Sequence, residues 1–158
     1  MHQNSDGMAR KIVLGILILA GFAACEGDYT LNPSMAGKIG STDWKSTVQT
    51  GIETDNTLTL TGISEDGKTI SISLLGTGEG EYKTVDNSWE TEFGAYYKAS
   101  EFDELTDAWI AFHGIVNITE IDEQTRSASG DFWFKMVRFD DTIKVEGGSF
   151  KDIRFTQP

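Results

Sequence analysis

Apolar and small polar residues alternate along much of the chain, and this period of two constrains the fold more than any other feature. In residues 58–61 and again in residues 70–73, every second residue is Leu or Ile, and the residues between them are Thr or Ser. Successive side chains of a strand point to opposite faces, so such segments form strands with one buried face. The sequence therefore predicts a pair of half-buried strands over residues 56–63 and 68–75.

The break between these two strands, residues 65–67, decides their register. A two-residue turn at Asp66-Gly67 would put Leu60 opposite a serine and split the apolar faces. A three-residue loop with Gly67 in the left-handed conformation instead pairs Leu60 with Ile72. Because a slip of one residue moves every side chain to the other face, we expect the three-residue loop.

The C-terminal third continues the alternation. Residues 114–121 alternate, residues 126–139 carry Phe132, Phe134 and Met136 on one face and Trp133 and Val137 on the other, and residues 142–155 follow a turn at Asp140-Asp141. The pair Gly147-Gly148 falls where the alternation changes from odd to even positions, which is typical of a β-bulge. We assign both Trp44 and Trp133 to the core.

Short strands separated by turns at regular spacing predict an all-β fold. We expect an antiparallel β-sandwich of about 8–9 strands, with a partly open, lipocalin-like β-barrel as the alternative. Only residues 103–112 have helical spacing. They predict at most one short helix or a packed loop, with one stripe formed by Leu105, Ala108, Trp109 and Phe112.

The segment before this domain predicts where the protein resides. Arg10 and Lys11 precede an uncharged, mostly apolar run that ends at Ala24-Cys25. A membrane-spanning helix needs roughly 20 apolar residues, and this shorter run has the basic start and small-residue end of a secretory signal peptide. Its end resembles the lipobox of bacterial lipoproteins, with Phe22 where that motif prefers Leu. The resemblance implies cleavage before Cys25 and acylation of its thiol, with about 0.8 kcal/mol of anchoring per buried methylene.

The expected organisation is a lipoprotein signal peptide over residues 1–24, a tether over residues 25–34 and a single β-rich domain over residues 35–158. Met1 and Met8 are alternative starts. Glu26 and Asp28 resemble the acidic export signal of Bacteroidetes-type lipoproteins. That resemblance implies the outer membrane, with the domain facing the cell surface. The alternative is the periplasmic face, with the two acidic residues merely solvating the tether.

The charge of the chain excludes one class of partner. It has 25 acidic and 13 basic residues and a net charge of −12. Nucleic-acid binding depends on Lys and Arg that neutralise phosphates, so we expect no nucleic-acid partner, and the acidic body should also stand off anionic lipid. The single cysteine leaves no disulfide pair, so packing alone must stabilise the domain.

Several segments of the domain also carry a resemblance. In order, they are Ala36-Gly37-Lys38-Ile39-Gly40 with Trp44, then Gly80-Glu81-Tyr82, residues 114–119, residues 129–134 and residues 143–150. Together with the lipobox they resemble a family of small Bacteroidetes lipoproteins of unknown function. The resemblance implies an all-β, lipid-anchored envelope domain, and it supplies no catalytic residues.

No pattern in the sequence points to an enzyme or a cofactor. His113 is the one histidine after the signal peptide, no G-x-S-x-G motif is present, and one His without a spare Cys cannot form a usual zinc site. The glycine-rich residues 76–80 precede an expected strand rather than a helix, so they are a loop and not a phosphate cradle. Acidic residues cluster at Glu101, Asp103, Glu104 and Asp107. They could supply the acid pair of a hydrolase or a weak Ca²⁺ site, but a solvated acidic loop is the favoured interpretation.

Aromatic residues gather between residues 82 and 112 among acidic and polar residues. Trp89, Tyr97 and Trp109 are our candidates for binding a glycan, with Trp89 and Tyr97 expected to be exposed; the competing interpretation is that these rings pack against the sandwich.

We therefore expect a non-catalytic, lipid-anchored binding or accessory module of the cell surface. An assembly protein that binds another envelope protein along a sheet edge is the second hypothesis, and an acid-pair hydrolase is the third. The oligomeric state does not follow from the sequence.

Overall fold

The fold is all-β, as the alternation predicts. The computed structural model describes residues 31–85, 91–100 and 103–158, and in them ten strands join one sheet. The strands are β1 (Ser34–Ile39), β2 (Thr42–Lys45), β3 (Val48–Thr54), β4 (Thr57–Ile63), β5 (Thr69–Leu74), β6 (Gly80–Thr84), β7 (Phe93–Lys98), β8 (Trp109–Asp122), β9 (Ser127–Arg138) and β10 (Asp141–Thr156). The described part of the chain contains no helix that is long and apolar enough to cross a membrane.

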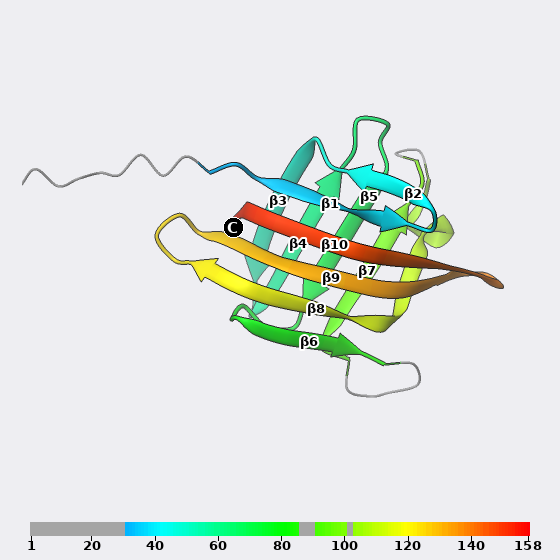
Figure 1. Cartoon of the computed structure of the whole chain (residues 1–158). Helices are drawn as coiled ribbons and strands as arrows, with labels where there is room; N and C mark the ends of the chain where they lie inside the picture. The colour runs from blue at the N-terminus through cyan, green and yellow to red at the C-terminus, as the bar shows by residue number, and fades with distance from the viewer. Residues whose placement is uncertain (1–30, 86–90, 101–102) are drawn as a thin grey trace, which may run out of the picture.

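The sheet folds over itself into two layers (Figure 1). One layer contains β3, β4, β5 and β7, and the strands of the other, β1, β2, β6, β8, β9 and β10, cross in front of it. The strand order is β2-β1-β10-β3-β4-β5-β7-β8-β6, and β9 lies between β10 and β8. Every strand pairing is antiparallel except that of β10 with β3, where Phe155 pairs with Gly51 in parallel. The two layers therefore belong to one continuous, hydrogen-bonded sheet.

The core lies between the layers and is built by the inward residues of nearly every strand. Its members are Met35, Trp44, Leu58, Leu60, Ile70, Ile72, Leu74, Phe93, Ala95, Tyr97, Trp109, Val116, Ile118, Ala128, Phe132, Phe134, Met136, Val145, Phe150, Ile153 and Phe155. Full burial of a Leu, Ile or Phe side chain contributes roughly 1.5–3 kcal/mol. A core of this size explains how the domain is stable without a disulfide.

The predicted register of β4 and β5 is confirmed. Leu60 pairs with Ile72, and Gly67 has a φ of 80° in the three-residue loop. On the outer face, the hydroxyls of Thr59 and Ser73 lie 2.9 Å apart and form a cross-strand hydrogen bond. The alternation of apolar and hydroxyl residues thus separates a buried face from a hydrogen-bonded outer face.

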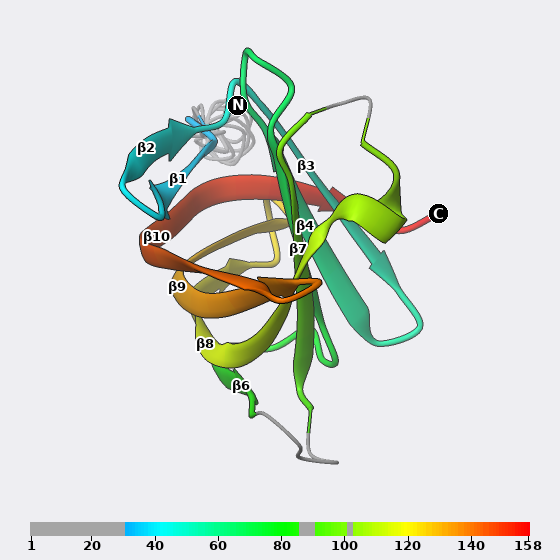
Figure 2. The ribbon, with the colours of Figure 1, turned by 90° about the vertical axis from the view of Figure 1, so that its right-hand side faces the viewer.

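Two bulges bend β10. The predicted one is confirmed, because the pairing with β9 shifts register between Val145 and Gly148. The second lies between Phe150 and Ile153, where Asp152 has a φ of 51°, and the sequence did not predict it. Because of these bends, β10 curves from the β9–β10 hairpin back to β3 (Figure 2).

Residues 103–112 form less helix than their spacing suggested. A single 3₁₀ turn, η1 (Leu105–Asp107), precedes β8, and Leu105 is 65% exposed. Trp109 and Phe112 belong to β8, so the helical stripe is wrong. From Ile110 onward these residues pair with β9 as a strand, and these inter-strand hydrogen bonds outweigh the local helical spacing.

The two tryptophans assigned to the core lie in different environments. Trp44 is 5% exposed, which confirms its assignment. Trp133 is 37% exposed and its ring centroid lies 5.5 Å from that of His113. The assignment of Trp133 to the core is wrong, because Phe132 and Phe134 occupy the inward positions and the alternation then turns Trp133 outward.

The junction of β10 and β3 requires a glycine. A Cβ added to Gly51 would lie 2.8 Å from both the Arg154 carbonyl oxygen and the Phe155 Cβ. We predict that Gly51→Ala lowers the free energy of unfolding by about 1–3 kcal/mol, measured by urea denaturation. Gly94→Ala is the control, because nothing lies within 4 Å of an added Cβ there. Equal stability of the two variants would contradict the prediction.

Candidate functional site

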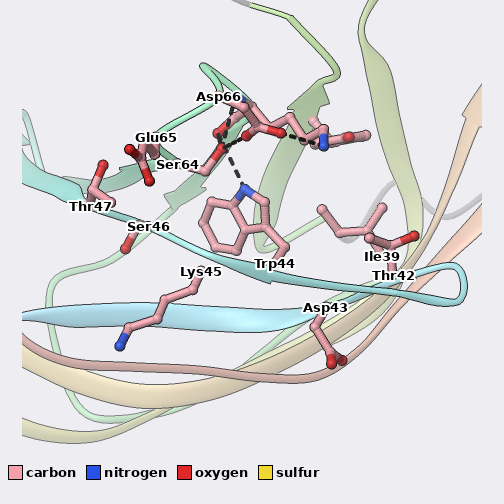
Figure 3. Close-up of a pocket in the computed structure, with 12 residues that line it drawn as sticks. Ile39, Thr42, Asp43, Trp44, Lys45, Ser46, Thr47, Ser64, Glu65 and Asp66 are labelled. Carbon is pink, nitrogen blue, oxygen red and sulfur yellow. Dashed lines mark hydrogen bonds and ion pairs between the residues drawn. The ribbon is translucent and has the colours of Figure 1, made fainter.

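A cavity lies between the β1–β2 hairpin and the β4–β5 turn (Figure 3). Its volume is about 720 Å³. Most of its lining residues are of polar types, although much of the surface they expose is apolar; they are Ile39, Thr42, Asp43, Trp44, Lys45, Ser46, Thr47, Ser64, Glu65, Asp66, Lys68 and Tyr97. We refer to it below as the hairpin cavity.

Hydrogen bonds fix the hairpin side of the hairpin cavity. The Trp44 indole N–H donates to the Lys68 carbonyl oxygen at 3.2 Å and thereby ties β2 to the start of β5. The buried Ser46 hydroxyl donates to the Met35 carbonyl oxygen at 2.9 Å and accepts from the Met35 N–H at 3.1 Å. The Gln49 amide donates to the same hydroxyl at 2.6 Å. This wall is therefore rigid and its buried polar groups are satisfied.

The opposite wall is a turn with a local charge pair. The Lys68 ammonium donates to Asp66 at 2.5 Å, and the Ser64 hydroxyl donates to the other Asp66 oxygen. The hydrogen bond from Lys68, followed by that from Ser64, lowers the pKa of Asp66 to about 2. The same pairing raises the pKa of Lys68. Both groups remain charged at neutral pH, and each largely neutralises the other.

Tyr97 supplies the one nearly buried phenol of the hairpin cavity. We expected Tyr97 to be exposed, but it is 7% exposed, so that expectation is wrong: residue 97 is an inward position of β7. Its hydroxyl has no hydrogen-bond partner among the described residues, although Tyr97 lines the cavity. Burial raises the pKa of Tyr97, so the hydroxyl stays protonated and can donate a hydrogen bond to a ligand.

The other glycan candidates do not form an exposed aromatic face with it. Trp109 is 8% exposed and lies next to Tyr97 across the β7–β8 pairing. The Arg138 guanidinium lies over the Trp109 ring, 4.6 Å from its centroid. Trp89 and Cys25 lie outside the described residues. The structure therefore brings Tyr97 and Trp109 together, but as inward-facing residues.

The acidic candidates do not converge. Glu104 and Asp107 are exposed, and Asp103 accepts a hydrogen bond from the Ser100 N–H at 3.0 Å. Across the described ranges, no group of three His, Cys, Asp or Glu side chains could hold a metal ion. Glu101 lies outside these ranges. Asp103, Glu104 and Asp107 thus do not form a Ca²⁺ ligand set in the described structure.

Sequence reasoning missed most of the cavity lining. The sequence predicts Trp44 as a core residue and assigns no binding role to Ser46, Asp66 or Lys68. Asp43-Trp44-Lys45 is one of the segments that carry the family resemblance, and this was the available signal. Arg138 carries no comparable signal in the sequence, because Trp109, the ring that its guanidinium contacts, is almost thirty residues away in the chain.

A comparison with known families finds one match. Residues 31–154 match the family described as Domain of unknown function (DUF6252). The chain belongs to this family. No curated protein matches it, and no solved structure does. The match agrees with the expectation of an uncharacterised family, while the lipoprotein character of the chain and its bacterial group remain predictions.

The paired Asp66 makes the stability of the domain depend on pH. A carboxyl whose folded-state pKa is lowered from 3.8 to about 2 stabilises the fold above pH 3.8, and this stabilisation is lost as the pH falls towards 2. We predict that Asp66→Asn melts below the unsubstituted protein at pH 6, and that the difference shrinks between pH 4 and 2.

Thermal melts at several pH values test this. Asp140→Asn is the matched control, because Asp140 is exposed and makes no ion pair among the described residues. A pH-independent difference for Asp66→Asn would show that the carboxylate charge does not matter there.

Proposed function

We propose that the protein is a lipid-anchored lipoprotein of the cell envelope and a non-catalytic surface module that binds a hydroxyl-rich ligand, such as a glycan, in the hairpin cavity. The observation that carries this proposal is Tyr97. Tyr97 as a residue is nearly buried, its hydroxyl lacks a hydrogen-bond partner among the described residues, and it lines a cavity of about 720 Å³, so this hydroxyl is suited to a ligand that supplies an acceptor.

The lining combines polar groups with apolar surface, and this mixture supports a sugar-like ligand. The Thr42 hydroxyl and the charged Asp66–Lys68 pair offer donors and acceptors, while the Thr47 and Ser64 hydroxyls are already hydrogen-bonded within the protein. Trp44 and Tyr97 add flat apolar surface at the base. Hydroxyl groups that alternate with C–H surface, as on a pyranose ring, match this mixture. Since Asp66 and Lys68 engage each other, we infer binding rather than acid–base catalysis.

The anchor is proposed from the sequence around Cys25. The fold begins at Ser34 with β1, and the intervening residues can span about 30 Å when extended. That reach lets the acidic body of a chain whose net charge is −12 stand clear of anionic headgroups. We place the domain on the outer membrane, facing the cell surface, with the periplasmic face as the alternative.

A second candidate function is binding of another envelope protein along a strand edge. β2 is one end of the strand order, so one edge of Thr42–Lys45 has no neighbouring strand in the described part of the chain. Such edges can accept a strand from a partner. This edge borders the hairpin cavity, so a peptide and a glycan would compete for the same place.

Acylation of Cys25 is directly testable. We predict that Cys25→Ser, expressed as the full chain in a Gram-negative host, loses incorporation of radiolabelled palmitate and leaves the membrane fraction. The serine differs from cysteine by one atom, and no other cysteine can be acylated in its place. Label retained by the variant would contradict the anchor.

Tyr97 tests the ligand site. We predict that Tyr97→Phe weakens binding of a soluble oligosaccharide about 2- to 10-fold, because one hydrogen bond is lost. The measurement is calorimetric titration of the full chain in detergent with a panel of neutral and uronate-containing oligosaccharides.

Tyr96→Phe is the matched control. Tyr96 lies in the same strand, and its ring points to the opposite face, so its loss should leave the affinity unchanged. If no member of the panel binds, or if the two variants behave alike, the hairpin cavity is not the glycan site.

A further inference from the structure

We infer that the ligand of the hairpin cavity carries a carboxylate and that Arg138 binds this group. This inference rests on the proposed function and names its ligand class, an acidic sugar such as a uronate. It starts from a row of inward residues at one end of the core. Ile70 pairs with Tyr97, Tyr97 pairs with Trp109, and the register of β8 with β9 places Arg138 next to Trp109.

Arg138 is held in place without a charge partner. Its guanidinium lies over the Trp109 ring, a cation–π contact that fixes the direction of the side chain. It forms none of the ion pairs in the described residues, although Asp141 is its register partner in β10. Its Nε is buried and has no hydrogen-bond partner.

The chain has 25 acidic and 13 basic residues, yet the guanidinium of Arg138 is stacked on a ring and does not pair with a carboxylate among the described residues. A buried N–H without an acceptor destabilises the fold, so the unpaired Nε of Arg138 calls for an explanation, and a bound group at the guanidinium is one. The guanidinium is therefore positioned for an external anion rather than for this chain's own acidic residues.

The chemistry of the row favours a carboxylate on a hydroxylated ring. The planar guanidinium fork matches the two oxygens of a carboxylate. The Tyr97 hydroxyl is a second free donor on the far side of Trp109, and it belongs to the hairpin cavity. Two strand spacings separate the backbones of Tyr97 and Arg138, about 10 Å, which is the length of a disaccharide. Arg138 does not itself line the hairpin cavity, so the ligand must extend past Tyr97 to meet it, and an acidic disaccharide unit has the length to do so.

The experiment compares two probes that share one sugar skeleton and differ in whether the carboxylates are free or methylated. Trigalacturonic acid and its methyl ester are titrated into the full chain in detergent. We expect the acid to bind at least tenfold more tightly than the ester. Arg138→Met should remove this preference without lowering the melting temperature, since it keeps an apolar stem over Trp109 and deletes the unpaired donor. Arg138→Lys keeps the charge but not the fork, and we expect it to show an intermediate preference.

Arg154→Met is the matched control, because Arg154 is exposed on β10, and it should retain the full preference for the acid. Equal binding of acid and ester, or a preference that survives in Arg138→Met, overturns the carboxylate assignment and leaves the proposed function standing. Competition by inorganic phosphate alone at the same concentration would mean a simple anion site and also overturns it. If neither probe nor a neutral oligosaccharide binds, both this inference and the proposed function fail.

Discussion

The structure depends on the three pairings of one strand, β10. This strand runs antiparallel to both β9 and β1, and its last residues run parallel to β3. A straight strand cannot keep partners in both layers, so the two bulges that bend β10 are what allow one sheet to cover both sides of the core. With no disulfide in the chain, this continuous hydrogen bonding and the core beneath it stabilise the domain.

The site follows from the same strand. β10 holds β1 in place, β1 holds β2, and the short hairpin of β1 and β2 can then lie against the β4–β5 turn through the hydrogen bond from Trp44 to Lys68. The hairpin cavity is the space left between these two turns. Several of its polar groups already form hydrogen bonds within the protein. The Tyr97 hydroxyl has no such bond among the described residues, so a ligand would gain a new hydrogen bond there.

The elements that sequence reasoning predicted well are those decided by neighbouring residues. The β4–β5 register follows from which slip keeps leucines and isoleucines on one face, and the bulge at Gly147-Gly148 follows from a change in alternation. The errors concern which face a large side chain takes. Trp133 and Tyr97 were placed on the wrong side because a tryptophan or tyrosine is compatible with either face, and size alone does not decide between them.

The sequence by itself determined the all-β class, the strand pair around residues 64–68, one of the two bulges and the absence of a disulfide framework. Each depends on the local period of two or on composition. Only the tertiary structure decided that β10 closes onto β3, that Trp44 meets the β4–β5 turn and that Tyr97, Trp109 and Arg138 lie side by side. These contacts join strands far apart in the chain. They depend on how the whole sheet curves, which no local pattern encodes.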